Sequence, residues 1–258
     1  MYSCHIIAHR GANKRAPQNT LPAFQKALEI GCDGFETDVH LSKDGVPIIC
    51  HNDTIDATSN GSGRISDLTL EQLKSYDFGS YFSREFAGTT LPTLDEFLAL
   101  AAQGGIEILN IELKKEPDDD RRDELVSKTL EAVERHGLND SLLISSFCPK
   151  ILKLTKQKNP AIQTAYLYPY GYLHALKVVI PPIRHMKELD CTASHPFKAC
   201  IRGDYVEQCH KNGLAVNVWT VDEAEEIRSM LRAGVDGIIT DCPDRVHYIL
   251  DEMNEAKA

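Results

Sequence analysis

Short apolar segments alternate with amphipathic segments along most of the 258-residue chain. Apolar runs of about four to eight residues favour buried strands, whereas apolar residues spaced three or four apart favour helices. We expect strands at His5–His9, Gly34–His40, Pro47–His51, Ile106–Glu112, Leu142–Ser146, Ile162–Leu167, Leu189–Ala193, Ala215–Trp219 and Gly237–Thr240. We expect helices at Leu21–Ile30, Leu94–Ala102, Arg121–Arg135, Tyr205–Asn212, Asp222–Arg232 and Pro243–Asn254. This alternation predicts an α/β fold with a parallel sheet and, at this length, a (β/α)8 TIM barrel.

The second and third expected strands are too close together for a parallel connection. Only Leu41–Val46 separates Gly34–His40 from Pro47–His51, whereas a parallel crossover needs about a dozen residues. The dipeptide Asp44-Gly45 is typical of a tight turn. We therefore expect a variant barrel with a β-hairpin after the second strand.

A symmetric hairpin predicts which residues face one another. A turn centred between Lys43 and Asp44 places His51 opposite Glu36. By the same count, Ile49 lies opposite Asp38. Neighbouring residues on paired strands share one face, and a slip by one residue would turn His51 to the other face.

The alternation of expected strands and helices is interrupted between residues 53 and 93. This stretch contains a polar, helix-like segment at Ser66–Tyr76 and several aromatic residues beyond it. Long non-repeating insertions serve as lids, binding elements or packing surfaces. We expect residues 1–258 to form a single domain, with residues 53–93 as a small inserted segment that caps one end of the barrel.

Composition limits the partners of the protein. The formal net charge of −10 disfavours sequence-independent nucleic-acid binding and stable membrane association, because both need basic surfaces. The N-terminus lacks the basic start and apolar run of a signal peptide. The eight cysteines contain no Cys-x-x-Cys pair, so we expect reduced, buried thiols and a cytoplasmic location. Composition leaves a homo-oligomer open.

Charged residues two apart on expected strands predict a site. Glu36 and Asp38 share one strand face, as do Glu112 and Lys114. A buried carboxylate without a partner is costly, and a divalent cation is the simplest partner. Three carboxylates suit Ca²⁺ or Mg²⁺, whereas the spacing of the histidines gives zinc less support. The alternative is an ion-pair network of these carboxylates with Lys114 and Arg10.

Two histidines end expected strands beside these charges. His9-Arg10-Gly11 closes the first strand, at the end of a barrel where active sites are built. Arginine can hold a phosphate in a bidentate fork, and His9 and His51 can act as a general acid and base. We expect Asp53 to orient His51 or to support the metal.

Three further positions have two interpretations each. Trp219 could pack against a substrate or fill the rim of the barrel mouth. Asn19 or Thr20 is expected to cap a helix whose N-terminus could also favour an anion. Asp241 follows the last expected strand, and we expect it to be a helix cap rather than a catalytic group.

An ordered set of short motifs spans nearly the whole chain. The motifs are His9-Arg10-Gly11, Gln18-Asn19-Thr20, Glu36-Thr-Asp38-Val, His51-Asn-Asp53, Glu112-Leu-Lys114, Ser146-Phe147, Val218-Trp219-Thr-Val and Thr240-Asp241-Cys-Pro243. Each is weak alone, but together and in this order they resemble the glycerophosphodiester phosphodiesterase family. The resemblance implies a phospholipase-C-like barrel that hydrolyses glycerophosphodiesters to sn-glycerol 3-phosphate and an alcohol.

The resemblance also implies roles for single residues. The implied ligands of one Ca²⁺ or Mg²⁺ ion are Glu36, Asp38 and Glu112. The implied acid–base pair is His9 and His51. Arg10 and Lys114 would hold the phosphate. Water or a neighbouring glycerol hydroxyl could be the nucleophile.

One position departs from the family pattern. The family has Glu before Asn-Thr, whereas this chain has Gln18, which removes a negative charge but keeps hydrogen-bonding capacity. Two other functions stay open at this point. One is a lysophospholipase D-type phosphodiesterase, and the other is a catalytically silent barrel that binds phosphodiesters.

Overall fold

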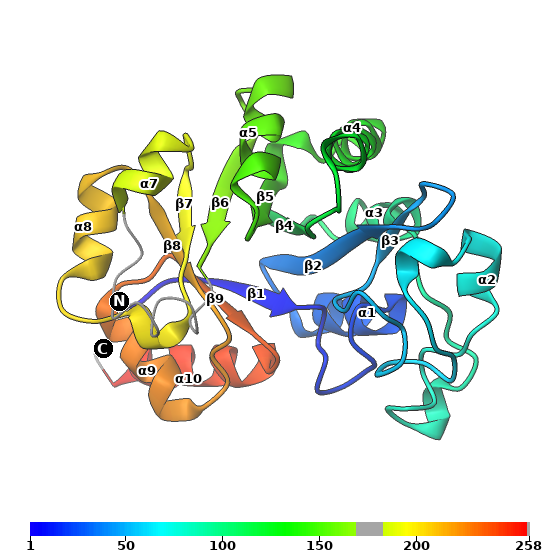
Figure 1. The fold of residues 1–258 in the computed structure, drawn as a ribbon. Coiled ribbons are helices and arrows are strands. Elements are labelled where there is room, and N and C mark those ends of the chain that lie inside the picture. Colours follow the sequence, from blue (N-terminus) through cyan, green and yellow to red (C-terminus); the bar gives the residue numbers. More distant parts are fainter. Residues whose placement is uncertain (169–182, 257–258) are drawn as a thin grey trace.

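The computed structural model describes residues 1–168 and 183–256 (Figure 1). Its strands are β1 (His5–His9), β2 (Gly34–Leu41), β3 (Pro47–Ile49), β4 (Ile108–Leu113), β5 (Leu142–Ser146), β6 (Gln163–Leu167), β7 (Ala193–His195), β8 (Ala215–Val218) and β9 (Gly237–Thr240). Its α-helices are α1 (Leu21–Ile30), α2 (Leu70–Lys74), α3 (Leu94–Ala101), α4 (Asp119–Arg135), α5 (Pro149–Lys158), α7 (Ile183–Glu188), α8 (Tyr205–Lys211), α9 (Ala224–Ala233) and α10 (Pro243–Glu255). Short 3₁₀ helices are η1 (Ile65–Asp67), η2 (Arg84–Phe86), η3 (Asn139–Ser141) and η4 (Lys198–Cys200).

The strands close into a barrel. Within the described residues, one nine-stranded sheet runs in the order β1-β9-β8-β7-β6-β5-β4-β2-β3, and β1 also pairs with β2. All neighbours are parallel except β3, which pairs antiparallel with β2. Helices follow the parallel strands and surround the sheet (Figure 1). The predicted (β/α)8 barrel with a hairpin after its second strand is confirmed.

The second strand separates the hydrophobic core from the barrel interior. All eight residues of β2 are buried. Phe35 points outward, where its ring packs 5.4 Å from Phe24 of α1 and 5.9 Å from Phe97 of α3. Alternation along the strand therefore directs Glu36 and Asp38 inward. The helices hold the sheet from outside, and the two carboxylates of the strand face the enclosed space.

The hairpin register differs from the predicted one by one residue. Val39, not Asp38, pairs with Ile49. The turn is centred on Asp44, and Gly45 adopts a left-handed φ of +74°. Regular pairing stops at Ile49, so the direction of the His51 side chain is not fixed by strand alternation. His51 faces the pocket in spite of the shift.

The seventh strand also begins later than predicted. Leu189 lies just after α7, and its N–H bonds to the carbonyls of His185 and Met186. Leu189 is buried because this helix end packs into the core, not because it belongs to a strand. The observed strand, β7, instead contains the buried polar residues Ser194 and His195. Because these polar residues interrupt the apolar run, the apolar pattern did not indicate the position of β7.

Between β3 and α3 the chain leaves the barrel. This part contains η1, α2 and η2 and packs around a small apolar cluster that also includes Ile48 of β3. Several hydrogen bonds attach it to the barrel, including two that involve Pro92 and Tyr81. The N–H of Ile49 bonds to the carbonyl of Pro92, and the N–H of Gln18 donates to the hydroxyl of Tyr81, 3.2 Å away. None of the helices in the described part of the chain is long and apolar enough to cross a membrane.

Candidate active site

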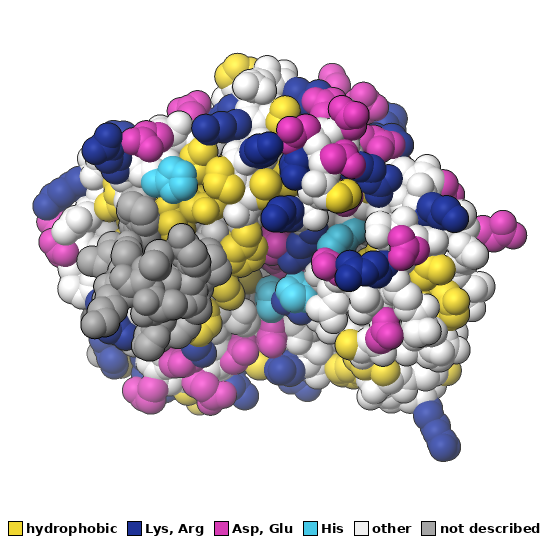
Figure 2. Space-filling model, in the orientation of Figure 1, with side chains coloured by type: hydrophobic (Ala, Val, Ile, Leu, Met, Phe, Trp, Pro, Cys, Tyr) yellow, Lys and Arg dark blue, Asp and Glu magenta, His cyan; other side chains and the backbone are white. Residues whose placement is uncertain are grey.

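A pocket opens at the carboxyl ends of the barrel strands. Its lining is His9, Arg10, Glu36, His51, Asn110, Glu112, Phe147, Leu167, Trp219 and Ile239. Figure 2 shows a hollow where hydrophobic side chains lie on one side and histidine, acidic and basic side chains on the other. A pocket with this mixed apolar and polar lining is typical of a small-molecule site.

The turn after β1 brings His9 and Arg10 into the pocket. Arg10 has a left-handed φ of +55°, and Gly11 follows with φ +80°. A Cβ atom on Gly11 would lie 2.6 Å from the backbone of Ala23, so only glycine fits there. A non-glycine residue held in left-handed geometry is strained by about 1–3 kcal/mol, a cost that is common at functional sites.

His9 is held by a carboxylate from the other end of the chain. Its Nδ1 lies 2.6 Å from Oδ1 of Asp241, and its Nε2 lies 3.9 Å from Oε2 of Glu36. Asn13 donates to the same oxygen of Asp241. Burial alone would raise the pKa of Asp241, but the hydrogen bond from His9 holds this pKa below its usual range. The expectation that Asp241 is a helix cap is wrong, because α10 is preceded by Cys242 and has no side-chain cap.

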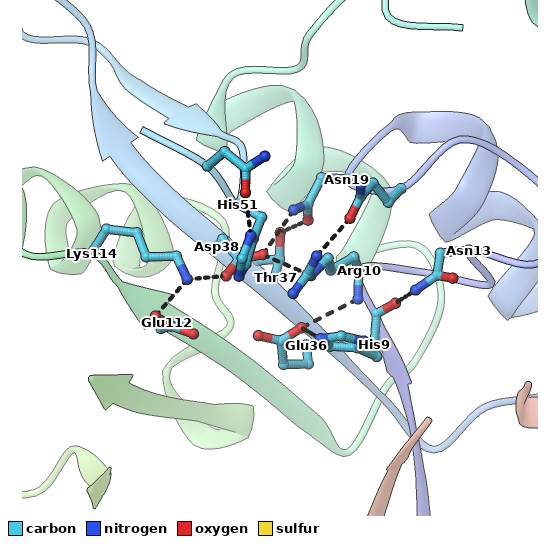
Figure 3. A network of polar contacts seen from close by, with 12 residues as sticks. His9, Arg10, Asn13, Asn19, Glu36, Thr37, Asp38, His51, Glu112 and Lys114 are labelled. Carbon is cyan, nitrogen blue, oxygen red and sulfur yellow. Dashed lines mark hydrogen bonds and ion pairs between the residues drawn. The ribbon is translucent and has the colours of Figure 1, made fainter. Parts of the chain in front are cut away.

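The three predicted carboxylates meet at the pocket (Figure 3). Glu36 pairs with His9 across the ladder, and Asp38 pairs with Glu112. One ligand atom from each carboxylate lies within 4.8 Å of the other two, and all three residues are buried. Burial and the charge of Asp38 raise the pKa of Glu36. Burial raises the pKa of Glu112 to about 7, although Lys114 opposes this shift.

Two basic side chains, those of Lys114 and Arg10, partly compensate the negative charge of the carboxylates. The Lys114 Nζ lies 2.6 Å from both Asp38 Oδ1 and Glu112 Oε1. Arg10 Nε lies 3.4 Å from Asp38 Oδ2, and Arg10 Nη1 donates to Gln18 Oε1 over 2.7 Å. Burial alone would raise the pKa of Asp38, but Lys114 and Arg10 hold it well below its usual range. The carboxylates Asp38 and Glu112 in turn raise the pKa of Lys114 against the effect of burial.

The donor set fits a hard divalent cation. Carboxylate oxygens are the ligands that Ca²⁺ and Mg²⁺ prefer, and three of them converge here. Burial is the main cause of the raised pKa values of Glu36 and Glu112, and Lys114 and Arg10 do not offset it fully. A bound cation would favour the charged form of both carboxylates. The two predicted alternatives, a cation site and an ion-pair network with Lys114 and Arg10, are therefore compatible in this cluster.

Asn19 fixes the position of Asp38. Its Nδ2 donates to Asp38 Oδ2 over 2.8 Å, and its Oδ1 accepts from Thr37 Oγ1 over 2.9 Å. Asn19 has a left-handed φ of +56°. Helix α1 begins after Thr20, whose side chain makes no capping hydrogen bond. We expected Asn19 or Thr20 to cap this helix, but the Asn19 side chain instead supports the acidic cluster.

His51 stands across the pocket from His9 and has a neutral partner. Its Nδ1 lies 2.7 Å from Oδ1 of Asn52. Asp53, which we expected to orient it, is exposed. Burial lowers the pKa of His51 to about 4, with Asp38 opposing the shift. The ring is therefore neutral near pH 7 and can accept a proton.

Aromatic residues form the opposite wall. Trp219 lies just after β8, and its Nε1 donates to the carbonyl of His195 over 2.8 Å. Phe147 packs against it edge-on at 6.0 Å, and Phe197 at 5.4 Å. Phe147 is 39% exposed. The tryptophan both supports the rim and faces the pocket, so the two interpretations of Trp219 are compatible.

The structure brings all eight predicted site residues together. Those that line the pocket are His9, Arg10, Glu36, His51, Glu112 and Trp219. Asp38 and Lys114 lie behind this surface, in contact with it. The sequence analysis missed Asp241 as a partner of His9, Asn19 as a support for Asp38, and Asn110 in the lining. Only Asn110 had a local signal, since it precedes Glu112 by two residues on the same strand.

The fold and the pocket define an enzyme of the (β/α)8-barrel class, with its polar groups at the carboxyl ends of the strands. Residues 9–245 match the glycerophosphoryl diester phosphodiesterase family. The chain belongs to this family.

Individual relatives agree over nearly the full length. A glycerophosphodiester phosphodiesterase of Caldanaerobacter subterraneus subsp. tengcongensis is 37% identical over 243 residues, which are 93% of this chain and 94% of the relative. One of Bacillus altitudinis is 35% identical over 250 residues, 96% of this chain and 98% of the relative. An Oleispira antarctica phosphodiesterase, solved with its product sn-glycerol-3-phosphate, is 29% identical with a TM-score of 0.85 and covers 96% of both chains.

Proposed function

We propose that the protein hydrolyses glycerophosphodiesters to sn-glycerol 3-phosphate and an alcohol, with the aid of one divalent cation. The observation that supports this most strongly is the convergence of three carboxylates, with ligand atoms within 4.8 Å of one another, in a pocket that His9 and His51 also line. Family membership supports the substrate class. The product-bound relative from O. antarctica supports the same product.

The proposed cation ligands are Glu36, Asp38 and Glu112, and the ion is Ca²⁺ or Mg²⁺. When bound, the cation would supply Lewis-acid stabilisation of negative charge on the phosphoryl oxygens. Arg10 and Lys114 would hold the phosphate and neutralise charge that develops during transfer. The side chains of Arg10 and Lys114 both contact Asp38, so a single carboxylate positions the phosphate-binding side of the pocket.

The histidines have different partners, and we propose different roles for them. His51 is neutral near pH 7 and accepts the proton of the nucleophile. His9, whose ring is oriented by Asp241, delivers a proton to the leaving alkoxide. Trp219 packs against the substrate. The nucleophile is water or a neighbouring glycerol hydroxyl, and reaction in oxygen-18 water with a search for a transient cyclic phosphate separates the two routes.

A second candidate is hydrolysis of a lysophospholipid headgroup, as by a lysophospholipase D. The exposed ring of Phe147 beside Trp219 favours it, because an apolar wall could also accept an acyl chain. The formal charge of −10 favours deacylated substrates, since an acidic protein is not attracted to anionic lipid surfaces. If neither substrate yields product, the remaining candidate is a catalytically silent barrel that binds phosphodiesters.

One experiment separates these functions. Purified protein is incubated with glycerophosphocholine or lysophosphatidylcholine, and product is followed by a coupled assay for glycerol 3-phosphate and by phosphorus NMR. We expect rapid release of glycerol 3-phosphate from the first substrate and at least about tenfold lower kcat/KM on the second. Preference for lysophosphatidylcholine would replace the proposal with the second candidate.

We also propose a cellular setting. All eight cysteines are free, and seven of them are buried, which suits a reducing, cytoplasmic location. The proposed partner is the small-molecule substrate alone, without nucleic acid or a stable membrane contact. We propose one domain over residues 1–258, with residues 53–93 capping the pocket end through the Tyr81 contact with Gln18. A homo-oligomer stays open.

A further inference from the structure

Asn110 is a buried polar residue of the pocket to which the proposed chemistry gives no role. It lies on β4 two residues before Glu112, so both side chains share the inner face. Its partner across the ladder is Glu36. The residue is 1% exposed and still lines the pocket. It therefore lies on the wall of the pocket, between two of the proposed cation ligands.

The Asn110 amide lacks a partner that comparable residues have. Its Oδ1 is buried and has no hydrogen bond among the described residues. By contrast, Asn19 is bonded at both ends of its amide, and Asn217 lies 3.0 Å from His195 Nε2. Buried polar groups are nearly always paired, because an unpaired one destabilises the fold. The missing partner of Asn110 is therefore expected to come from the pocket.

The neighbours of Asn110 select the chemistry of that partner. Glu36 and Glu112 flank it, and a charged phosphoryl group is drawn to the proposed cation and to the basic side chains rather than to a neutral amide. The phosphate belongs near Arg10 and Lys114, which contact Asp38. An amide offers both an acceptor and a donor, which match a hydroxyl group. A neutral hydroxyl can also lie between two carboxylates without repulsion.

We propose that Asn110 binds a hydroxyl of the glycerol moiety and thereby selects glycerophosphodiesters over diesters that lack it. This inference rests on the proposed function. A site built to bond a hydroxyl discriminates strongly against an analogue without one, because its buried polar group is then left unpaired. Ser145 Oγ and His195 Nδ1 also lack partners in the barrel interior, so an internal water that serves these groups is the alternative.

The test compares two ligands that differ only in hydroxyl groups. Calorimetry measures the Kd of sn-glycerol 3-phosphate and of propyl phosphate for the full chain in the presence of Mg²⁺ or Ca²⁺. We expect wild type to prefer glycerol 3-phosphate. In Asn110→Ala this preference should fall by about tenfold, the loss of one well-formed hydrogen bond, while the Kd of propyl phosphate changes by less than about threefold.

The control is Asn217→Ala, which removes a buried amide of the same barrel that already has a partner in His195. It should leave the ratio of the two Kd values unchanged. Asn110→Ser, a smaller change, is measured in the same way and should also lower the preference.

Equal weakening of both ligands, or an unchanged ratio in Asn110→Ala and Asn110→Ser, would overturn the inference and leave only an internal water. Hydrolysis of glycerophosphocholine by wild type is measured on the same preparation. If hydrolysis proceeds and the ratio does not respond, only the role of Asn110 is wrong. If wild type neither hydrolyses this substrate nor prefers glycerol 3-phosphate, the proposed function and the inference both fail.

Discussion

Replacing Asp241 by Asn should impair catalysis without removing any group that contacts the substrate. Asp241 accepts from His9 Nδ1 over 2.6 Å and is not part of the pocket lining. The carboxylate can only accept a hydrogen bond, so it holds a proton of the imidazole on Nδ1. An amide can accept or donate, and Asp241→Asn therefore no longer fixes which ring nitrogen faces the pocket with a proton.

The structure sets the size of this effect. A hydrogen bond to a charged group contributes about 1.5–3 kcal/mol, and a 2.6 Å contact with a carboxylate that is 16% exposed belongs to this class. Each 1.36 kcal/mol corresponds to about tenfold in rate. We expect kcat to fall by about 10- to 150-fold, while KM changes by less than about threefold because substrate binding is untouched.

The assay is steady-state release of glycerol 3-phosphate from glycerophosphocholine, with circular dichroism and thermal unfolding as checks on the fold. Asp244→Asn is the matched control. Asp244 lies in the first turn of α10, close to Asp241 in sequence, but its carboxylate contacts Arg15 at the surface, so its removal should leave kcat within about twofold of wild type. A correctly folded Asp241→Asn enzyme with wild-type kcat would refute the proposed role of Asp241.

Three further outcomes are expected. His9→Ala and His51→Ala should each lower kcat by about 10²- to 10⁴-fold with the fold intact, as circular dichroism would verify, and activity within a few-fold of wild type would exclude the acid–base assignment. Glu36→Gln should raise the concentration of Mg²⁺ or Ca²⁺ needed for half-maximal activity, whereas an unchanged metal requirement would count against its ligand role. The metal-free protein should lose stability as the pH rises from about 5 to about 8, because the pKa of Glu112 is raised to about 7 in the folded state and the folded state binds the extra proton in that window. Added metal should then raise Tm more at about pH 8 than at about pH 5.5, and an equal rise at both would contradict the raised pKa.

Local patterns were enough to predict most of the fold and the centre of the site. Alternation along β2 places Glu36 and Asp38 on one face whatever the rest of the fold does. The hairpin followed from the short gap between β2 and β3, but its register did not. The left-handed φ of Gly45 moves the centre of the turn by half a residue, and pairing shifts by one.

Long-range partners could not be predicted in the same way. His9 and Asp241 are 232 residues apart and meet only because β9 closes the barrel against β1. Asparagine is a common helix-cap residue, so the sequence favoured that role for Asn19. Its left-handed backbone, which the sequence did not indicate, turns the amide toward Asp38. β7 was misplaced because its buried positions hold Ser194 and His195, which an apolar pattern does not mark.

The central proposal is that the carboxylate cluster binds a cation needed for phosphodiester hydrolysis. The most direct test measures glycerol 3-phosphate released from glycerophosphocholine before chelation, after exhaustive chelation, and after addition of Mg²⁺ or Ca²⁺. We predict release by the untreated enzyme, loss on chelation and recovery with one of the two ions. Full activity after chelation, or no release under any of these conditions, would contradict the proposal.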